Sequence, residues 1–439
     1  MIRSISVDGL FGLYNYNISF PQKPTVKILT GPNGYGKTSL LIAIDHLFKG
    51  DLWFFHFFEF KKIRINFKEK SIVINRSYIS NMNDSDILID NSNDRKYEEI
   101  VSLLTFQEKE IEHVTINEDY IQGLLKSIKR KFIRDSFDSQ NDEDLIARYY
   151  EKEDDEYIQQ HCRNISVALQ EYDTLYLPAQ RVFIRKHNSY PFRSHHYSYE
   201  IDRVNEEISR LYRNTLNSFA SASQRIDATY ISRLIKRSDE YSKEDIELKL
   251  RDLKSKIEGY KELNLINNME ILDNSIEDEV SFKEFNKVLS LYIDDMNEKM
   301  KQFETFYKNI SLYKQIIDKK VLSEKSIDFC ENGLIIKNIN GHRLTNLHKL
   351  SSGEQNLLIL YFNLVFRANS NTILLIDEPE NSIHVAWLSK MLNDYIEMAN
   401  TIGYQIILAT HSPTFIDGRW DLCTDLYRQF KGKDSNEQL

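Results

Sequence analysis

Apolar and polar positions alternate along the first part of the chain, which is the pattern of strands that bury one face. The predicted strands are 2–8, 13–20, 26–30, 59–67 and 71–77. A glycine-rich run follows the strand at 26–30, and a helical pattern from 39 to 47 comes after it. The last two strands form a predicted antiparallel pair. This part of the chain therefore predicts a mixed α/β layer with a strand, a glycine loop and a helix in succession.

The remaining sequence changes from charged to helical and then to an alternation of helix and strand. From about 80 to 165 it is polar and charged with helical patches, and a strand follows at 174–177. Apolar residues at three- and four-residue steps predict helices at 198–237, 243–262 and 283–319, with strands at 326–330 and 333–338. Then come a helix at 354–367, a strand at 372–376, a helix at 383–398 and a strand at 405–409. This last alternation is typical of a parallel sheet.

The length of 439 residues allows about three domains. We predict an N-terminal α/β part at 1–187 that carries the charged insertion at about 80–165. A helical insertion follows at 188–345, and a C-terminal α/β part occupies 346–439.

Composition narrows the class of protein. No run reaches the roughly 20 apolar residues that a membrane-spanning helix needs, and the start lacks the apolar core of a signal peptide. The three cysteines are far apart, which favours reduced thiols in the cytoplasm over a zinc site. The net charge of −9 gives no global reason for tight nucleic-acid binding.

The glycine-rich run matches the phosphate-loop pattern GxxxxGK[ST] at every fixed position. The residues expected to hold nucleotide here are Gly31, Pro32, Asn33, Gly34, Tyr35, Gly36, Lys37, Thr38 and Ser39. Glycines let successive backbone N–H groups point at a phosphate, and the following helix presents its positive N-terminus to the same anion. Lys37 would reach the β- and γ-phosphates of ATP, and the Thr38 hydroxyl would bind Mg²⁺.

An apolar strand ends in Asp377 and Glu378, which supply a second part of such a site. Asp377 would hold Mg²⁺ through water, and Glu378 would act as the general base for the attacking water.

The string Leu350 to Gln355, LSSGEQ, resembles the signature motif of ABC ATPases. In that family the signature completes the nucleotide site of a second subunit, so the resemblance implies an ATP-bridged dimer. Ser352, Gly353 and Glu354 are the corresponding candidate ligands.

Two further residues resemble ABC motifs by their place in the chain. His411 follows the strand at 405–409 and resembles the switch histidine that contacts the γ-phosphate. Gln180 follows the strand at 174–177 and resembles the glutamine that senses Mg²⁺. The order of all five motifs resembles that of ABC heads. The expected fold is thus an ABC ATPase head, with a mixed sheet, an antiparallel β subdomain and a helical insertion.

The sequence DEPENSIHVAW at 377–387 resembles the RecF-like and overcoming-lysogenisation-defect-like branch of these ATPases. Together with YLPAQR at 176–181, it is most similar to the ATPase subunit of the PARIS anti-phage defence system. That resemblance implies a higher homo-oligomer, a separate Toprim-type nuclease effector and a phage trigger protein. The chain ends soon after His411, so we expect the nuclease to be a separate protein.

Other interpretations remain open at this point. A DNA-repair ATPase of the RecF or break-repair kind would bind DNA across its dimer, and a Septu-like defence pair would use an HNH nuclease. The basic stretch 126–134 would suit nucleic-acid phosphates, but a solvated helix explains it better. His187, His195 and His196 fit a polar loop better than a metal site.

Overall fold

The computed structural model divides the chain into two compact units. Unit 1 comprises Met1–Ala179, Ala368–Glu380 and Leu388–Leu439, and unit 2 comprises Gln180–Arg367 and Asn381–Trp387. The structure describes residues 1–23, 25–50, 54–55, 58–68, 71–79, 101–108, 172–185, 197–266, 279–320, 324–344 and 346–434. The basic stretch 126–134, the three histidines named above and Cys162 lie outside these residues.

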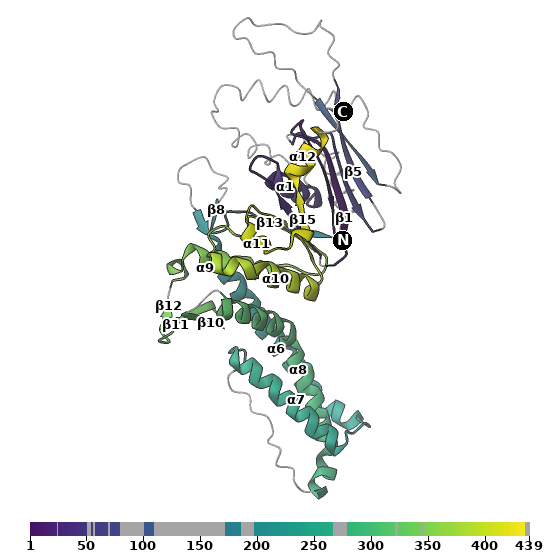
Figure 1. The fold of residues 1–439 in the computed structure, drawn as a ribbon. Coiled ribbons are helices and arrows are strands. Elements are labelled where there is room, and N and C mark those ends of the chain that lie inside the picture. Colours follow the sequence, from purple (N-terminus) through teal and green to yellow (C-terminus); the bar gives the residue numbers. More distant parts are fainter. Residues whose placement is uncertain are drawn as a thin grey trace, which may run out of the picture. The chain divides into compact units, whose positions relative to one another are not determined.

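A parallel sheet forms one layer of unit 1 (Figure 1). Its strands are β3 (Val26–Thr30), β7 (Asp173–Leu177), β13 (Thr372–Asp377), β14 (Gln405–Ala409) and β15 (Cys423–Asp425). They lie in the order β15-β3-β14-β13-β7, and every neighbouring pair is parallel. All residues of β3, β13 and β14 are buried, as expected where both faces of a sheet are covered. The segments that follow these strands emerge at one edge, where open α/β sheets bind ligands.

An antiparallel sheet forms the second layer of unit 1. Its strands are β1 (Ile2–Leu10), β2 (Tyr14–Ser19), β4 (Lys62–Phe67), β5 (Ser71–Ile79) and β6 (Val101–Glu108), in the order β2-β1-β4-β5-β6. The prediction of helical patches from 80 to 165 was wrong at β6. Its eight residues pair along β5 from Ile79 opposite Val101 to Ile72 opposite Glu108. This pairing with the preceding strand overrides the charged composition on which the prediction relied.

Helix α1 (Lys37–Phe48) connects the cores of the two sheets. A single cluster of buried apolar side chains includes Ile5 of β1, Leu41 of α1 and Ile407 of β14. The C-terminal part of the chain adds α10 (Val385–Ile402), which begins in unit 2 and belongs to unit 1 from Leu388 onward. Unit 1 also contains α11 (Pro413–Ile416), a 3-10 turn at Trp420–Leu422 and α12 (Leu426–Asp434). The phosphate-loop helix is thus held from both sides by apolar packing.

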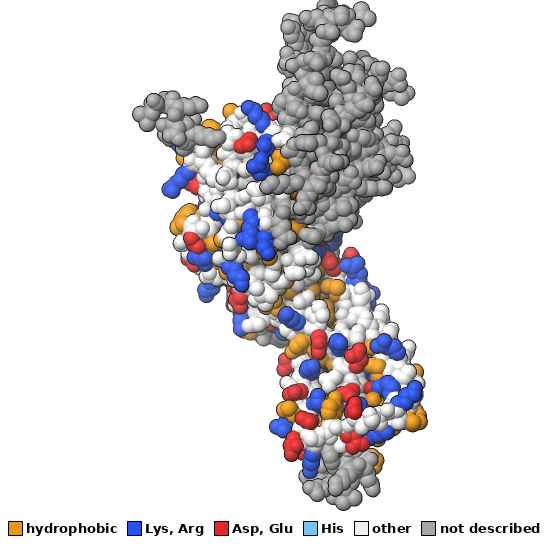
Figure 2. Space-filling model, turned by 90° about the vertical axis from the view of Figure 1, so that its right-hand side faces the viewer, with side chains coloured by type: hydrophobic (Ala, Val, Ile, Leu, Met, Phe, Trp, Pro, Cys, Tyr) orange, Lys and Arg blue, Asp and Glu red, His pale blue; other side chains and the backbone are white. Residues whose placement is uncertain are grey.

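Unit 2 is built on the three long helices that the sequence predicted. They are α6 (Glu200–Lys236), α7 (Lys243–Glu262) and α8 (Glu279–Lys320). Ion pairs join α6 to α8, among them Arg237 with Asp294 at 2.7 Å and Lys299 with Asp227 at 2.7 Å. Figure 2 shows basic and acidic side chains interspersed over this helical part. No helix among the described residues has both the length and the hydropathy to cross a bilayer.

Short elements complete unit 2. Strands β8 (Phe183–Arg185) and β9 (Tyr197–Tyr199) pair with each other, and β10 (Lys325–Cys330), β11 (Gly333–Asn338) and β12 (Arg343–Leu344) form an antiparallel sheet. A 3-10 turn at Leu347–Lys349 leads to α9 (Ser352–Phe362), and a π-helix at Asn363–Arg367 follows directly. Contacts group α9 with the long helices of unit 2, whereas the sequence analysis placed it in the C-terminal ATPase part.

Replacing Leu41 with alanine tests whether α1 carries the core of unit 1. Leu41 is fully buried, so Leu41→Ala should lower the free energy of unfolding by about 2–5 kcal/mol. Leu13 is 63% exposed, and Leu13→Ala should change the same free energy by less than about 0.5 kcal/mol. Chemical denaturation measures both. Equal effects of the two variants would contradict this account of the core.

Candidate functional site

The loop between β3 and α1 requires glycine at several positions. Gly31, Gly34 and Gly36 have φ angles of 141°, 86° and 78°, in the region that side-chain-bearing residues avoid. A Cβ on Gly36 would also lie 2.8 Å from Leu10 Cδ2. Gly36 is the N-cap of α1 and offers no side chain to the free N–H groups of the first turn. The loop and the helix start therefore form a cradle of N–H groups suited to an anion.

Aromatic side chains hold this loop against the rest of unit 1. The Tyr16 hydroxyl donates a hydrogen bond of 2.8 Å to the carbonyl of Tyr35. The Tyr35 ring packs against Tyr14 and Tyr427, with ring centroids 5.4 and 5.3 Å away. Burial raises the pKa of Tyr16 well above its ordinary value, so its hydroxyl keeps the proton that it donates. The loop is thus anchored to the rest of unit 1 through Tyr35, by its carbonyl and by its ring.

Lys37 lies across the loop. Its ammonium donates to the carbonyl oxygens of Gly31 and Pro32 at 2.8 and 3.0 Å, and the residue is 6% exposed. Burial lowers the pKa of Lys37, and the carboxylates of Glu378 and then Asp377 oppose that shift. A phosphate would give this cation charged acceptors, which bind it more strongly than neutral carbonyls do. Lys37 therefore fits a phosphate in this loop.

Thr38 and Asp377 provide oxygen atoms beside the loop. The Thr38 hydroxyl donates to Asp377 Oδ2 at 2.9 Å, and Asp377 is 4% exposed. Mg²⁺ in nucleotide sites takes one or two carboxylates or hydroxyls together with phosphate oxygens and water. This pair would hold such an ion. Among the described residues, no group of three or more His, Cys, Asp and Glu has the geometry of a metal site.

Glu378 and His411 approach each other at the same edge of the sheet. Glu378 has a φ of 42°, which is unusual for a residue with a side chain. Its N–H donates to the Ala409 carbonyl at 2.9 Å, so the end of β14 holds the strained backbone. The carboxylate of Glu378 lies 3.8 Å from His411 Nε2 and is 40% exposed. An accessible base beside an imidazole is suited to proton transfer from water.

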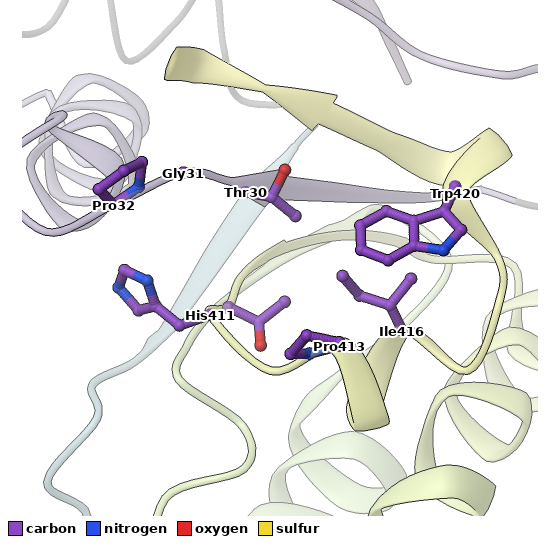
Figure 3. Close-up of a pocket in the computed structure, with 8 residues that line it drawn as sticks. Thr30, Gly31, Pro32, His411, Pro413, Ile416 and Trp420 are labelled. Atoms are coloured by element: carbon purple, nitrogen blue, oxygen red, sulfur yellow. The ribbon is translucent and has the colours of Figure 1, made fainter. Parts of the chain in front are cut away.

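A pocket of about 250 Å³ opens next to His411 (Figure 3). Gly31 and Pro32 of the phosphate loop line it together with His411 and Trp420. The imidazole of His411 lies toward Pro32, and the indole of Trp420 lies at the other end. The switch-histidine candidate thus faces the beginning of the phosphate loop.

Glu380 is a residue near this site that the sequence analysis missed. Its Oε1 accepts hydrogen bonds from the Thr410 hydroxyl at 2.5 Å and from the His411 N–H at 3.1 Å. The sequence signal was a third acid close to Asp377 and Glu378. Without the fold, nothing indicated that this acid meets the segment around His411.

The signature string begins α9 in unit 2. Ser351 and Glu354 form a capping box, in which the Ser351 Oγ accepts from the Glu354 N–H at 3.2 Å and Glu354 Oε2 accepts from the Ser351 N–H at 2.8 Å. Glu354 also pairs with Lys325 at 2.6 Å. Burial raises the pKa of Glu354, but its hydrogen bonds from Lys325 and Ser351 outweigh that effect and lower it. The Glu354 carboxylate is thus engaged within unit 2.

Ser352 and Gly353 are placed differently from Glu354. Ser352 is exposed at the N-terminus of α9. A Cβ on Gly353 would lie 2.5 Å from the Ser382 carbonyl oxygen, so this position needs glycine. Gln180 is exposed and is the first residue of unit 2. The expected residues therefore form two groups: the loop, Asp377, Glu378 and His411 in unit 1, and the signature and Gln180 in unit 2.

The chain is similar to solved structures of Smc head domains. Two solved structures are similar: the Smc head domain with an extended coiled coil bound to the C-terminal domain of ScpA from Pyrococcus furiosus, and the Smc head bound to the C-winged helix domain of ScpA. Identities are 14% and 12%, TM-scores are 0.35 and 0.41, and the matches cover 94% and 95% of this chain and 90% and 91% of those chains. None of the curated proteins matches.

The sequence profile of the AAA ATPase domain family matches residues 1–416. This match covers unit 2 and most of unit 1, including the phosphate loop, the signature string, Gln180, Asp377, Glu378 and His411. The chain belongs to the AAA ATPase domain family.

Proposed function

We propose that this chain is an ATP-hydrolysing switch that works as a dimer, with each ATP held between the phosphate loop of one copy and the signature helix of another. The observation that carries the proposal is the grouping of Lys37, Thr38, Asp377 and Glu378 at one edge of the parallel sheet. Phosphate binding, Mg²⁺ binding and water activation each have a suitable side chain there.

The phosphate loop would bind ATP through its charge and its backbone. Lys37 would leave the carbonyls of Gly31 and Pro32 and pair with the β- and γ-phosphates. The N–H groups at the start of α1 would donate to the same oxygens. Thr38 and Asp377 would hold Mg²⁺, which neutralises charge on the phosphates during transfer.

Hydrolysis needs a base for water and a donor for the γ-phosphate. Glu378 would take one proton from the attacking water as the new O–P bond forms and the bond to the ADP oxygen breaks. His411, 3.8 Å from that carboxylate, would donate a hydrogen bond to the γ-phosphate. The strained backbone of Glu378 supports this role because such strain is stored at functional sites.

The signature helix supports the dimer. Ser351 caps the Glu354 N–H, and the exposed Ser352 at the start of α9 is available to an anion. In ABC ATPases, which this string resembles, the signature acts on the nucleotide of a second subunit. We therefore assign Ser352 and Gly353 to the γ-phosphate of the partner copy. Gln180 would contact Mg²⁺ when ATP joins two copies.

The signature helix is also fixed to the long helices of unit 2. The Arg367 guanidinium, in the π-helix after α9, donates to Glu207 Oε2 at 2.6 Å and to Glu200 Oε1 at 3.3 Å. The buried Tyr313 hydroxyl of α8 donates to the Leu358 carbonyl of α9 at 2.9 Å. A helix held to both α6 and α8 would carry any change at the nucleotide to the helical part, where a partner protein could sense it.

An effector controlled by this switch would be a separate nuclease in anti-phage defence. The resemblance of residues 377–387 and 176–181 to the PARIS ATPase subunit supports this role. Tagged protein purified from its own cells should carry a Toprim-type nuclease that is silent in the complex and active after release. A preparation without any nuclease, whose ATP turnover rises with DNA and whose DNA binding weakens with salt, would favour a DNA-repair role instead.

Glu378→Gln tests the base and the dimer together. The amide keeps the shape of the side chain but accepts no proton at neutral pH, so ATP hydrolysis should fall by about 10²–10⁴-fold. ATP-Mg²⁺ should remain bound and should hold the protein as a dimer, which light scattering after gel filtration would detect.

The matched control is Glu397→Gln, which changes an exposed glutamate of α10 and should hydrolyse ATP like the unaltered protein. Undiminished turnover by Glu378→Gln would remove Glu378 from its assigned role.

Arg367→Met tests the link between α9 and α6. Methionine keeps much of the packing over the Phe362 ring but leaves Glu200 and Glu207 without their shared cation. ATP should still bind to the phosphate loop of unit 1, whereas ATP-dependent dimer formation should weaken by about tenfold or more.

Arg210→Met is the matched control, since Arg210 lies 3.8 Å from Glu207 and its side chain is 68% exposed. Fluorescent-nucleotide binding and light scattering separate the two effects. Dimer formation that is equally strong in both variants would exclude the link.

A further inference from the structure

Glu380 lies in the turn that follows β13, close to the two acids with assigned roles. Glu378 and Glu380 flank Pro379, which is buried. The turn is fixed at its start, because the Glu378 N–H donates to the Ala409 carbonyl at 2.9 Å. Glu380 is less exposed than a free surface acid, and its Oε2 is buried from solvent. Its carboxylate therefore points into the protein rather than into water.

The partners of this carboxylate belong to the segment that carries His411. Glu380 Oε1 accepts from the Thr410 hydroxyl at 2.5 Å and from the His411 N–H at 3.1 Å. Thr410 is fully buried, so its hydroxyl has no access to water as an alternative partner. Glu380 Oε1 thus holds both the Thr410 side chain and the backbone N–H of His411.

The hydroxyl of Thr410 extends this contact to the other side of His411. It accepts a hydrogen bond of 3.0 Å from the Ser412 N–H, and Ser412 in turn caps α11 by accepting from the Phe415 N–H at 3.2 Å. Phe415 is fully buried, which fixes the far end of the series. The chain before and after His411 is therefore tied, through Thr410, to a single carboxylate.

The same turn also positions the base. Since Glu378 and Glu380 share a turn, a shift of the His411 segment relative to Glu380 would change the 3.8 Å separation between His411 Nε2 and the Glu378 carboxylate. A displacement of about 1 Å in a catalytic group can cost on the order of 10²-fold in rate.

We propose that Glu380 is a positioning residue that holds His411 in register with Glu378 through Thr410. This inference rests on the proposed ATPase function of the site. Glu380 itself touches neither ATP nor the attacking water. It acts by accepting two hydrogen bonds, so an uncharged acceptor of the same shape should replace it.

Four variants test the proposal by steady-state ATP hydrolysis. Glu380→Ala removes the acceptor and should lower kcat by about 100-fold with little change in KM, because the Lys37 loop is held by other contacts. Glu380→Gln keeps a side-chain carbonyl that can accept both hydrogen bonds and should retain most of the rate.

Thr410→Val keeps the shape of the side chain but removes its hydroxyl, and should lower kcat about tenfold. The double variant Glu380→Ala with Thr410→Val should be no slower than Glu380→Ala alone, since the two side chains act as one unit.

Several outcomes would overturn the positioning role of Glu380. A Glu380→Gln variant as slow as Glu380→Ala would overturn the proposal, because the charge and not the acceptor would then be needed. A fall in kcat and a rise in KM of equal size would also overturn it, since a general loss of structure affects both. Glu397→Ala controls for the loss of one negative charge in unit 1. If the unaltered protein hydrolyses no ATP, the proposed function fails; if it does and Glu380→Ala matches it, only this inference fails.

Discussion

The hydrogen bond between Thr38 and Asp377 joins residues that are 339 positions apart in the chain, and the candidate site depends on it. Thr38 is the second residue of α1, at the end of the phosphate loop, and Asp377 ends β13. The strand between them in the sheet is β14, which pairs with β3 on one side and β13 on the other. Parallel pairing therefore places the loop, the acids and His411 at one edge. Without that register, no two of these groups would meet.

The division into two units has a consequence for function. Lys37 begins α1 of unit 1, beside the parallel sheet, and Ser352 begins a helix that is packed against the long helices of unit 2. A nucleotide bound by both would connect the sheet of one copy with the helical part of another. The free energy of ATP binding would then favour the joined copies, and hydrolysis would allow the copies to separate. Such an arrangement suits a switch, in which ATP changes the assembly of copies, better than an enzyme that serves to make a product.

The sequence predicted the elements that rest on local patterns. The strand, loop and helix around Lys37 and the long helices of unit 2 are confirmed because glycine, apolar periodicity and length act within short stretches. Strand β6 was missed because its pairing with β5, at the end of the antiparallel sheet, is not visible in the polar and charged composition around it. The contact of Glu380 with Thr410 was missed for a similar reason: 30 residues separate them, and only parallel pairing of β13 with β14 brings them together.

A mixing experiment tests the central claim most directly. Lys37→Ala removes the phosphate-binding cation, and Ser352→Arg blocks the signature, so each variant alone should hydrolyse little ATP. If Ser352 serves the nucleotide of another copy, an equimolar mixture should recover up to about a quarter of the unaltered rate, because half of the dimers are mixed and each holds one complete site. A mixture no more active than the sum of the two variants measured separately would contradict the account.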